Sequence, residues 1–155
     1  MDFTHLKDDG QVKMVDVSSK DYSERKAIAS GKIYLSKKTI QMIYDDKLKK
    51  GNVLTTAQIA GIMAVKKTSE LIPLAHNINI TSSDIKFTSA PDYIECIAII
   101  KCFGNTGVEM EAIIATNIAL ATIYDMCKSV DKDMIISDIK LDYKSGGRSG
   151  EYVRK

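Results

Sequence analysis

The chain has 155 residues, of which 45% are hydrophobic and 27% charged, a balance typical of one globular domain that can bury its own core. Its 22 basic and 20 acidic residues leave a net charge of only +2, which argues against a nucleic-acid-binding protein. No stretch looks long and apolar enough to span a bilayer, and the polar N-terminus does not resemble a signal peptide. We therefore expect a cytoplasmic protein that binds neither nucleic acid nor membrane.

The first half of the chain predicts a strand followed by a short helix. Residues 11–20 alternate weakly between apolar and polar, which indicates a short strand or an ordered arm. Residues 25–36 predict a strand in which Gly31 marks a bulge or a bend. Ser36 is a favourable N-cap for a helix over 37–50.

A second helix is expected within residues 51–74 and is ended by Pro73. Thr55 and Gln58 fit a capping box, in which two side chains satisfy the free amides of a helix start. Its apolar positions recur at helical spacing and predict a stripe that faces the core, made of Ile59, Ile62, Met63 and Val65.

Two strands follow, over 78–89 and 92–104, with their turn at 90–92. Residues 108–130 then predict the longest helix, which is apolar around much of its circumference and should be largely buried. A second capping box, formed by Thr106 and Glu109, is expected to start it.

The last strand is predicted over 134–143, and a Gly/Ser-rich basic tail over about 144–155 is expected to be mobile. The order is strand, helix, helix, strand, strand, helix, strand. It favours a single α+β domain over 1–155, a ferredoxin-like antiparallel sheet with helices packed on one face.

The longest helix also carries polar residues at regular spacing. Glu111 lies two heptads before Asp125, near the same side. Asp125 and Lys128 at i, i+3 have a plain interpretation as a surface ion pair at a helix end. One face of this helix is expected to hold Met110, Ile114, Asn117, Ala121, Asp125 and Lys128.

Cysteine and histidine are sparse. The three cysteines form no CxxC pair, which suits a reduced compartment, and no cysteine lies near a histidine, so we expect no transition-metal site. Cys127 is best interpreted as a buried packing residue. The five positions are Cys96, Cys102, Cys127, His5 and His76.

Two other positions admit a plain and a functional interpretation. Lys50 lies in a Lys-Lys-Gly turn that is either solvated or holds an amine near a phosphate. His76 follows a proline after a helix and is either structural or able to donate to a phosphate or move a proton. Together these residues suggest an anionic ligand.

Six segments in this order resemble the MoaC family of molybdenum-cofactor biosynthesis, over nearly the whole chain. They are MVDVS (14–18), KKGNV (49–53), IAGIMAVKKTSELIPLAH (59–76), TGVEMEA (106–112), IYDMCKSVDKDM (123–134) and KSGGRSG (144–150).

The resemblance implies a phosphorus–oxygen lyase of ferredoxin-like fold with no metal or redox cofactor. It implies conversion of 3′,8-cyclo-7,8-dihydroguanosine 5′-triphosphate, a cyclised GTP derivative made by a radical enzyme, to cyclic pyranopterin monophosphate and diphosphate. It also implies a homohexamer, a trimer of dimers, with active sites at subunit interfaces.

Residue roles implied by the resemblance fall on matching positions. The catalytic group falls on Asp125, Lys50 and Lys128. The substrate-binding group falls on Leu74, Ala75, His76, Met110, Glu111, Arg25, Lys66 and Lys67. This chain departs from the family's usual pattern at Asn52, commonly an aspartate, and in the loop at Ala75 and Asn77, commonly cysteine and proline.

The implied chemistry needs protons moved and a diphosphate released. Clustered lysines can neutralise the phosphates, and a lysine among other cations is expected to have a lowered pKa. Asp125 could accept a proton or hold Lys128 in place. Two alternatives stay open: a non-catalytic nucleotide- or pterin-binding protein, and an RNA-binding α+β domain, which the charge balance disfavours.

Overall fold

The structure, a computed structural model, describes residues 9–148 and 150–155, so His5 and Ser149 lie outside the described residues. The predicted order of strands and helices is confirmed, and a short final strand is added to it. The elements are β1 (Ser23–Tyr34), α1 (Lys37–Tyr44), α2 (Val53–Leu71), β2 (Ile80–Ser89), β3 (Tyr93–Gly104), α3 (Glu109–Cys127), β4 (Ile135–Ser145) and β5 (Tyr152–Val153).

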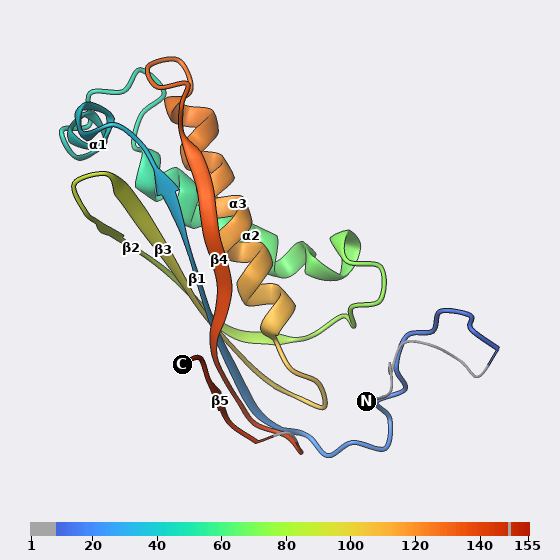
Figure 1. Cartoon of the computed structure of the whole chain (residues 1–155). Coiled ribbons are helices and arrows are strands. Elements are labelled where there is room, and N and C mark those ends of the chain that lie inside the picture. The colour runs from blue at the N-terminus through green and yellow to red at the C-terminus, as the bar shows by residue number, and fades with distance from the viewer. Residues whose placement is uncertain (1–8, 149) are drawn as a thin grey trace.

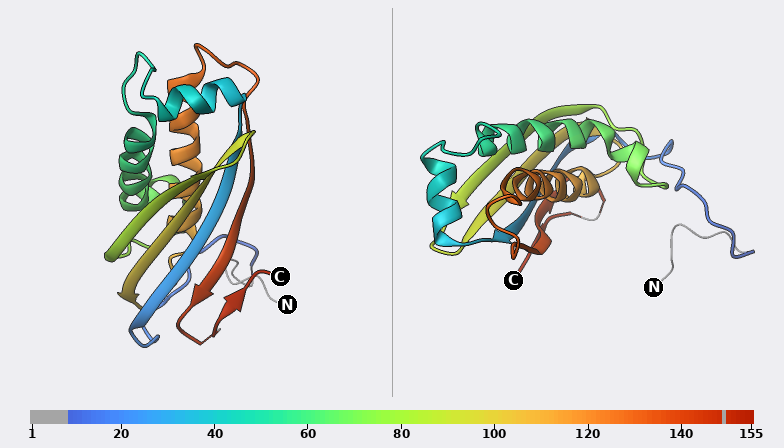
Figure 2. Two further views of the ribbon diagram at one scale, coloured as in Figure 1. Left: turned by 90° about the vertical axis from the view of Figure 1, so that its left-hand side faces the viewer. Right: turned by 90° about the horizontal axis from the view of Figure 1, so that it is seen from above.

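The strands form one antiparallel sheet in the order β2-β3-β1-β4-β5. The first four strands in this order are the arrangement of a ferredoxin-like fold, which confirms the predicted class. Helices α2 and α3 cover one face of the sheet, and α1 lies at one end of it (Figure 1; Figure 2). The strand β1 lies at the centre, between β3 and β4.

Alternate residues of the central strands point toward the helices and build the core. On β1 these are Ala27, Ala29 and Ile33, each with no exposed surface. The facing helices bring mostly small side chains to the contact, which lets the two helices and the sheet approach closely. On α3 the fully buried residues include Ala112, Ala115 and Ala119, and on α2 they include Ala57.

Gly31 is a point at which side chains of α3 and β4 lie close against β1. A Cβ atom there would lie 2.8 Å from Ile139 Cγ1 and 3.0 Å from both Leu120 Cδ1 and Thr116 Cγ2. The pairing of β1 with β4 also shifts register between Ser30 and Lys32, so the predicted irregularity at Gly31 is confirmed. The glycine is therefore needed for space, because a side chain would push α3 away from the sheet.

Helix starts are partly as predicted. The Ser36 hydroxyl accepts a hydrogen bond from the Thr39 amide at 3.2 Å and caps α1, as expected. The predicted capping box of Thr55 and Gln58 is wrong, because the Asn52 side chain accepts from the Thr55 amide at 2.8 Å and starts α2 earlier. The Gln58 amide is used instead to tie α2 to β2, donating to the Ile85 carbonyl at 2.9 Å.

The second predicted capping box, at the start of α3, is also wrong. The N-cap is Val108, and no side chain caps the helix there. Glu109 instead forms an ion pair with Lys144 on β4, with Glu109 Oε1 2.9 Å from Lys144 Nζ. A charged partner from a distant strand therefore replaces the local capping contact with Thr106.

The predicted apolar stripe of α2 is only half correct. Val65 is buried and Ile62 packs against the core, but Ile59 and Met63 are 54% and 58% exposed. The physical reason is that α2 meets the core through smaller residues such as Ala57. This helix thus carries apolar side chains on two sides, and the described residues leave the side with Ile59 and Met63 exposed.

The prediction that no stretch is long and apolar enough to span a bilayer does not hold for α3. By length and composition alone it is long and apolar enough, but half of that window is buried inside the fold. Such burial is also found in the core helix of a globular domain. Because about half of this window is buried, the prediction that the helix is largely buried is met only in part.

Replacing Gly31 by alanine is expected to lower the free energy of unfolding by about 1–3 kcal/mol, because the new methyl group overpacks the contact between β1 and α3. Urea unfolding at one fixed protein concentration measures this change. Gly104→Ala is the matched control, since a Cβ atom there would meet Cys102 Sγ at 3.5 Å, an ordinary contact. Equal stability of Gly31→Ala and wild type would contradict the close approach.

Candidate functional site

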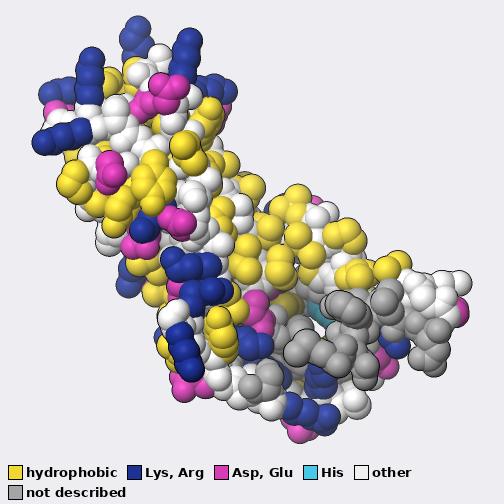
Figure 3. Space-filling view, viewed as in Figure 1, with side chains coloured by type: hydrophobic (Ala, Val, Ile, Leu, Met, Phe, Trp, Pro, Cys, Tyr) yellow, Lys and Arg dark blue, Asp and Glu magenta, His cyan; other side chains and the backbone are white. Residues whose placement is uncertain are grey.

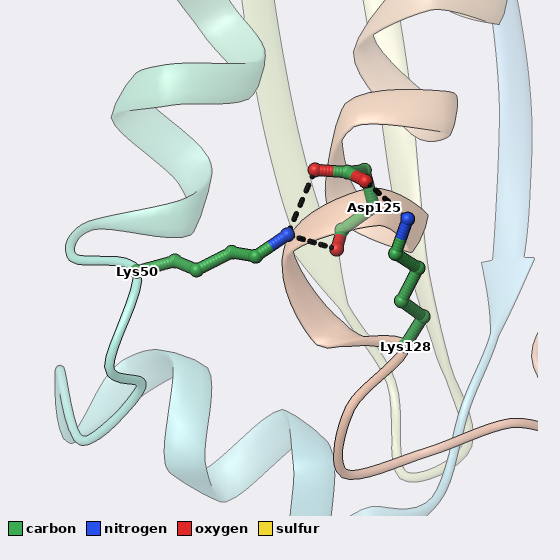
Figure 4. A network of polar contacts seen from close by, with 3 residues as sticks. All are labelled: Lys50, Asp125 and Lys128. Atoms are coloured by element: carbon green, nitrogen blue, oxygen red, sulfur yellow. Dashed lines mark hydrogen bonds and ion pairs between the residues drawn. The ribbon is translucent and has the colours of Figure 1, made fainter.

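A carboxylate held between two ammonium groups lies at the C-terminal end of α3 (Figure 4). Asp125 Oδ2 is 2.9 Å from Lys50 Nζ, and Asp125 Oδ1 is 2.7 Å from Lys128 Nζ. Lys50 also donates to the Asp125 backbone carbonyl at 2.8 Å. The three predicted catalytic residues are therefore brought together, with all three side chains about half exposed to solvent.

Asp125 and Lys128 favour each other's charged form, and Lys50 adds a second ion pair to Asp125. Hydrogen bonds from Lys128 and from Lys50 lower the pKa of Asp125 to about 2. The hydrogen bond to Asp125 in turn raises the pKa of Lys128, so the expectation of a lowered lysine pKa is not met at this position. A carboxylate of such low pKa is a weak proton acceptor, and its main effect is to orient the two ammonium groups.

A second group of predicted residues surrounds a cavity of about 480 Å³ near the N-terminal end of α3. Five of the predicted substrate-binding residues line it: Leu74, Ala75, His76, Met110 and Glu111. The N-terminal arm borders the same cavity, and the His76 ring Nε2 is 2.7 Å from the Val15 carbonyl. The residues predicted as a strand or an arm thus include a segment that lies against the candidate site.

Glu111 is the most unusual titratable group of this cavity. It is only 3% exposed, and burial raises its pKa to about 7, in spite of a backbone hydrogen bond that acts to lower it. The nearby charge of Glu109 raises the pKa further. A carboxyl group with a pKa near neutrality can both donate and accept a proton at working pH.

An adjoining cavity of about 660 Å³ contains Arg25, which is 8% exposed. Its guanidinium donates to the Gly104 carbonyl at 3.1 Å and to the Asp21 carbonyl at 3.4 Å, and among the described residues it forms no ion pair. A Cβ atom at Gly147, whose φ is +74°, would collide with this guanidinium. A buried cation paired only with neutral carbonyls favours an anionic ligand.

Lys66 and Lys67 are not brought to either group. Lys66 lines a separate cavity beside β2, and Lys67 forms an exposed ion pair with Glu70, with Nζ and Oε1 2.8 Å apart. Within one chain, the structure therefore brings three of the eleven predicted site residues together at Asp125, five around the cavity beside Glu111 and one, Arg25, in the adjoining cavity, and leaves these two elsewhere on α2.

The two groups lie at opposite ends of α3. Glu111 and Asp125 are fourteen residues apart on one helix, which separates them by about 21 Å along its axis. The sequence spacing correctly placed polar residues along one helix, but a shared helix face does not bring its two ends together. The Lys50–Asp125–Lys128 cluster and the His76–Glu111 cavity cannot act on the same reacting atoms within one chain.

Several lining residues were missed by the sequence reasoning. They come from three loops that only the fold brings together: Lys20, Asn105, Thr106, Gly107 and Arg148. The sequence signals for them were the family-like segment 106–112, which contains Thr106 and Gly107, and the basic, glycine-rich character of 144–150. No local pattern pairs that segment with Lys20 or with the loop before α3.

The cysteines are packing residues in this structure. Cys127 has no exposed surface, and burial raises its pKa to about 11, which makes its thiol a poor nucleophile. In the part of the chain that the structure describes, no three His, Cys, Asp or Glu side chains gather into a group able to hold a metal ion.

Fold and site together define an α+β protein whose cationic surfaces suit a small anionic substrate. The chain belongs to the MoaC family, whose sequence profile matches residues 14–147. It is similar to three proteins named cyclic pyranopterin monophosphate synthase. That of Peptoclostridium acidaminophilum is 51% identical over 155 residues, 100% of this chain and 99% of that protein.

The second of these, from Clostridium acetobutylicum, is 51% identical over 154 residues, which cover 98% of this chain and 96% of that protein. The third, from Chloroflexus aurantiacus, is 48% identical over 155 residues, which cover 99% of this chain and 95% of that protein. The similarity therefore extends over nearly the whole length of each relative rather than over one motif.

Glu111→Gln is expected to flatten the dependence of stability on pH. The folded-state pKa of about 7 lies above the ordinary value of 4.5, so between these values the folded chain holds a proton that the unfolded chain has lost. The contribution of Glu111 to the free energy of unfolding therefore decreases as pH rises through this window, by up to a few kcal/mol, and is constant above it.

Thermal unfolding at several pH values between 5 and 8 measures this effect. The Glu111→Gln variant should gain stability over wild type as the pH rises. Glu70→Gln, which alters an exposed carboxylate of α2, is the control and should keep the wild-type slope. An unchanged slope in Glu111→Gln would show that burial does not disfavour its charge.

Proposed function

We propose that this chain is a cyclic pyranopterin monophosphate synthase, a lyase of molybdenum-cofactor biosynthesis. Its substrate is 3′,8-cyclo-7,8-dihydroguanosine 5′-triphosphate, made from GTP by a radical enzyme in the cytoplasm, and its products are cyclic pyranopterin monophosphate and diphosphate. The observation that carries the proposal is about 50% identity over the full length to synthases of that name, together with the family match.

The Lys50–Asp125–Lys128 cluster supplies fixed positive charge to the reaction. Asp125 stays ionised and orients both ammonium groups, the second of the two roles considered for it. Lys50 and Lys128 then stabilise negative charge as the cyclic phosphate closes and the diphosphate departs. Figure 3 shows further Lys and Arg side chains gathered at this end of the molecule, where α1 lies, which raises the local concentration of an anionic substrate.

The other cavities bind the rest of the substrate and move protons. Glu111, with a pKa of about 7, is suited to proton transfer during ring rearrangement. Arg25 offers a buried cation to a phosphate group, and His76 is placed to donate to the substrate when it releases the Val15 carbonyl. Leu74, Ala75 and Met110 supply the apolar wall against which a pterin ring packs. Lys66 and Lys67, which lie away from this cavity, act on the substrate bound by a neighbouring copy of the chain.

One active site is built from two copies of the chain, in a homohexamer arranged as a trimer of dimers. This arrangement accounts for the separation of the two groups along α3, since the lysine cluster of one copy can then meet the Glu111 cavity of another. The uncovered apolar side of α2, with Ile59 and Met63, offers surface for contacts between copies.

Lys50→Ala and Lys128→Ala are expected to fold normally and to lose turnover by about a hundredfold or more. Both side chains are exposed, so their ion pairs add little to stability. Incubation with the cyclised substrate and detection of diphosphate measures turnover, and Lys86→Ala, which breaks an exposed pair with Asp84, is the matched control. Wild-type turnover in either variant would remove that lysine from the mechanism. If the wild-type protein binds the substrate tightly but releases no diphosphate, the result favours a non-catalytic pterin-binding protein.

Mixing two inactive variants tests the shared site. His76→Ala and Lys128→Ala alter groups at opposite ends of α3, and each alone disables every site. After dissociation and reassembly together, random pairing leaves both groups intact in about one quarter of the sites, and turnover should recover to about that fraction. Mixed assemblies verified by mass spectrometry but without recovered activity would place the whole site in one chain.

A further inference from the structure

The loop that follows α3 crosses the start of α1 and is bonded to it. Asp131, in this loop, accepts a hydrogen bond through Oδ2 from the Ser36 amide at 2.8 Å and from the Thr39 hydroxyl at 3.0 Å. The first turn of α1 has no acidic residue of its own. Asp131 therefore supplies, from 92 residues away from Thr39 in sequence, the negative charge that the helix start favours.

This contact is specific and partly shielded from water. Thr39 is only 2% exposed, and its hydroxyl lies 2.8 Å from that of Ser36, so the three side chains form one small network. Partial burial acts to raise the pKa of Asp131, but the hydrogen bonds from Ser36 and Thr39 outweigh it and the pKa is lowered. The carboxylate stays ionised at neutral pH.

The segment 36–50 is thus attached to the end of α3 at two places. At its start, Ser36 is bonded to Asp131, and at its end Lys50 is bonded to Asp125, six residues before Asp131. Between these anchors, the segment packs into the core through buried apolar residues, namely Ile40, Ile43 and Leu48. The core contacts keep α1 on the domain, while the polar contact at Ser36 fixes how α1 sits relative to the end of α3.

We propose that Asp131 is a positioning residue for Lys50: by fixing the start of α1 against the loop after α3, it sets the place from which the Lys50 ammonium reaches Asp125. The Lys50 side chain is about half exposed and leaves a turn containing Gly51, so its own surroundings restrict it weakly. A displacement of α1 would shift this turn as well, because only residues 45–49 separate Lys50 from the end of α1 at Tyr44. The expected effect of Asp131 on kcat rests on the proposed catalytic role of Lys50. The expected effect of Asp131 on the contact between Lys50 and Asp125 does not.

The test uses the full chain with isotope-labelled aspartate and follows the carboxyl group of Asp125 by NMR as the pH is lowered. Asp131→Ala should raise the titration midpoint of Asp125, the same direction that is expected for Lys50→Ala, which removes a hydrogen bond that lowers the Asp125 pKa. Asp131→Asn keeps an acceptor oxygen for Ser36 and Thr39 and should retain the wild-type midpoint. In turnover assays, Asp131→Ala should lower kcat about tenfold with KM changed less than about twofold, and Asp131→Asn should restore most of kcat.

Gln58→Ala is the matched control, because it removes one hydrogen bond between α2 and β2 without touching segment 36–50. It should leave the Asp125 titration and kcat unchanged. Thr39→Val removes one of the two bonds to Asp131 at nearly constant volume, should shift the Asp125 midpoint by a smaller amount, and keeps the test open if Asp131→Ala does not fold.

The outcomes separate the two proposals. An Asp125 titration that is the same in wild type, Asp131→Ala and Thr39→Val overturns the positioning role, whatever the kinetics. A shifted titration in a protein that releases no diphosphate even as wild type supports the positioning role and refutes the proposed function. A fall in kcat that Asp131→Asn does not restore, with no shift in titration, shows a loss of stability and overturns the inference.

Discussion

The close packing of α3 against β1 at Gly31 is the constraint on which the rest of the structure depends. Because no side chain separates them there, α3 lies directly on the centre of the sheet. The helix is rigid and runs across the domain (Figure 1), so fixing its middle also fixes both of its ends. One end carries Glu111 beside the cavity lined by His76, and the other carries Asp125 between two lysines. The fold therefore holds two chemically different groups at a constant separation.

The charged groups at the two ends of α3 lie in opposite environments, exposed at one end and buried at the other. At the C-terminal end of α3 the acid and its two lysine partners are exposed and paired, and this pairing lowers the pKa of Asp125 and raises the pKa of Lys128. At the N-terminal end, burial dominates: Glu111 is shifted toward its neutral form, and within the described part of the chain Arg25 is bonded to backbone carbonyls and to no carboxylate. The first environment is suited to stabilising phosphate charge, and the second to exchanging protons and admitting an anion. A reaction that both rearranges a ring and closes a cyclic phosphate needs both environments.

The sequence was sufficient for features that depend on neighbours in the chain. Ser36 caps α1, Pro73 follows the end of α2, and the strand predicted over 92–104 is β3. It failed at both predicted capping boxes, for different reasons. At α2 the cap is a local residue, Asn52, three positions before Thr55, whereas at α3 the distant Lys144 pairs with Glu109. Helical spacing predicted which residues share a face of α3, but not that a 19-residue helix keeps its two ends apart. The assignment of Lys50 to the same site as Asp125 came from family resemblance, since 75 residues separate them and no local pattern links them.

The departure at Asn52 shows how the lysine cluster depends on tertiary structure. The family commonly has an aspartate at this position, next to the turn that contains Lys50. Here the Asn52 side chain is used to cap α2, a role that an amide oxygen fills as well as a carboxylate. Among the described residues, Asp125 is then the only carboxylate that forms an ion pair with Lys50, and it lies on a different element. The direction of the Lys50 ammonium is therefore set by how the segment before α2 docks on the end of α3, and the contact of Asp131 with Ser36 lies at that junction.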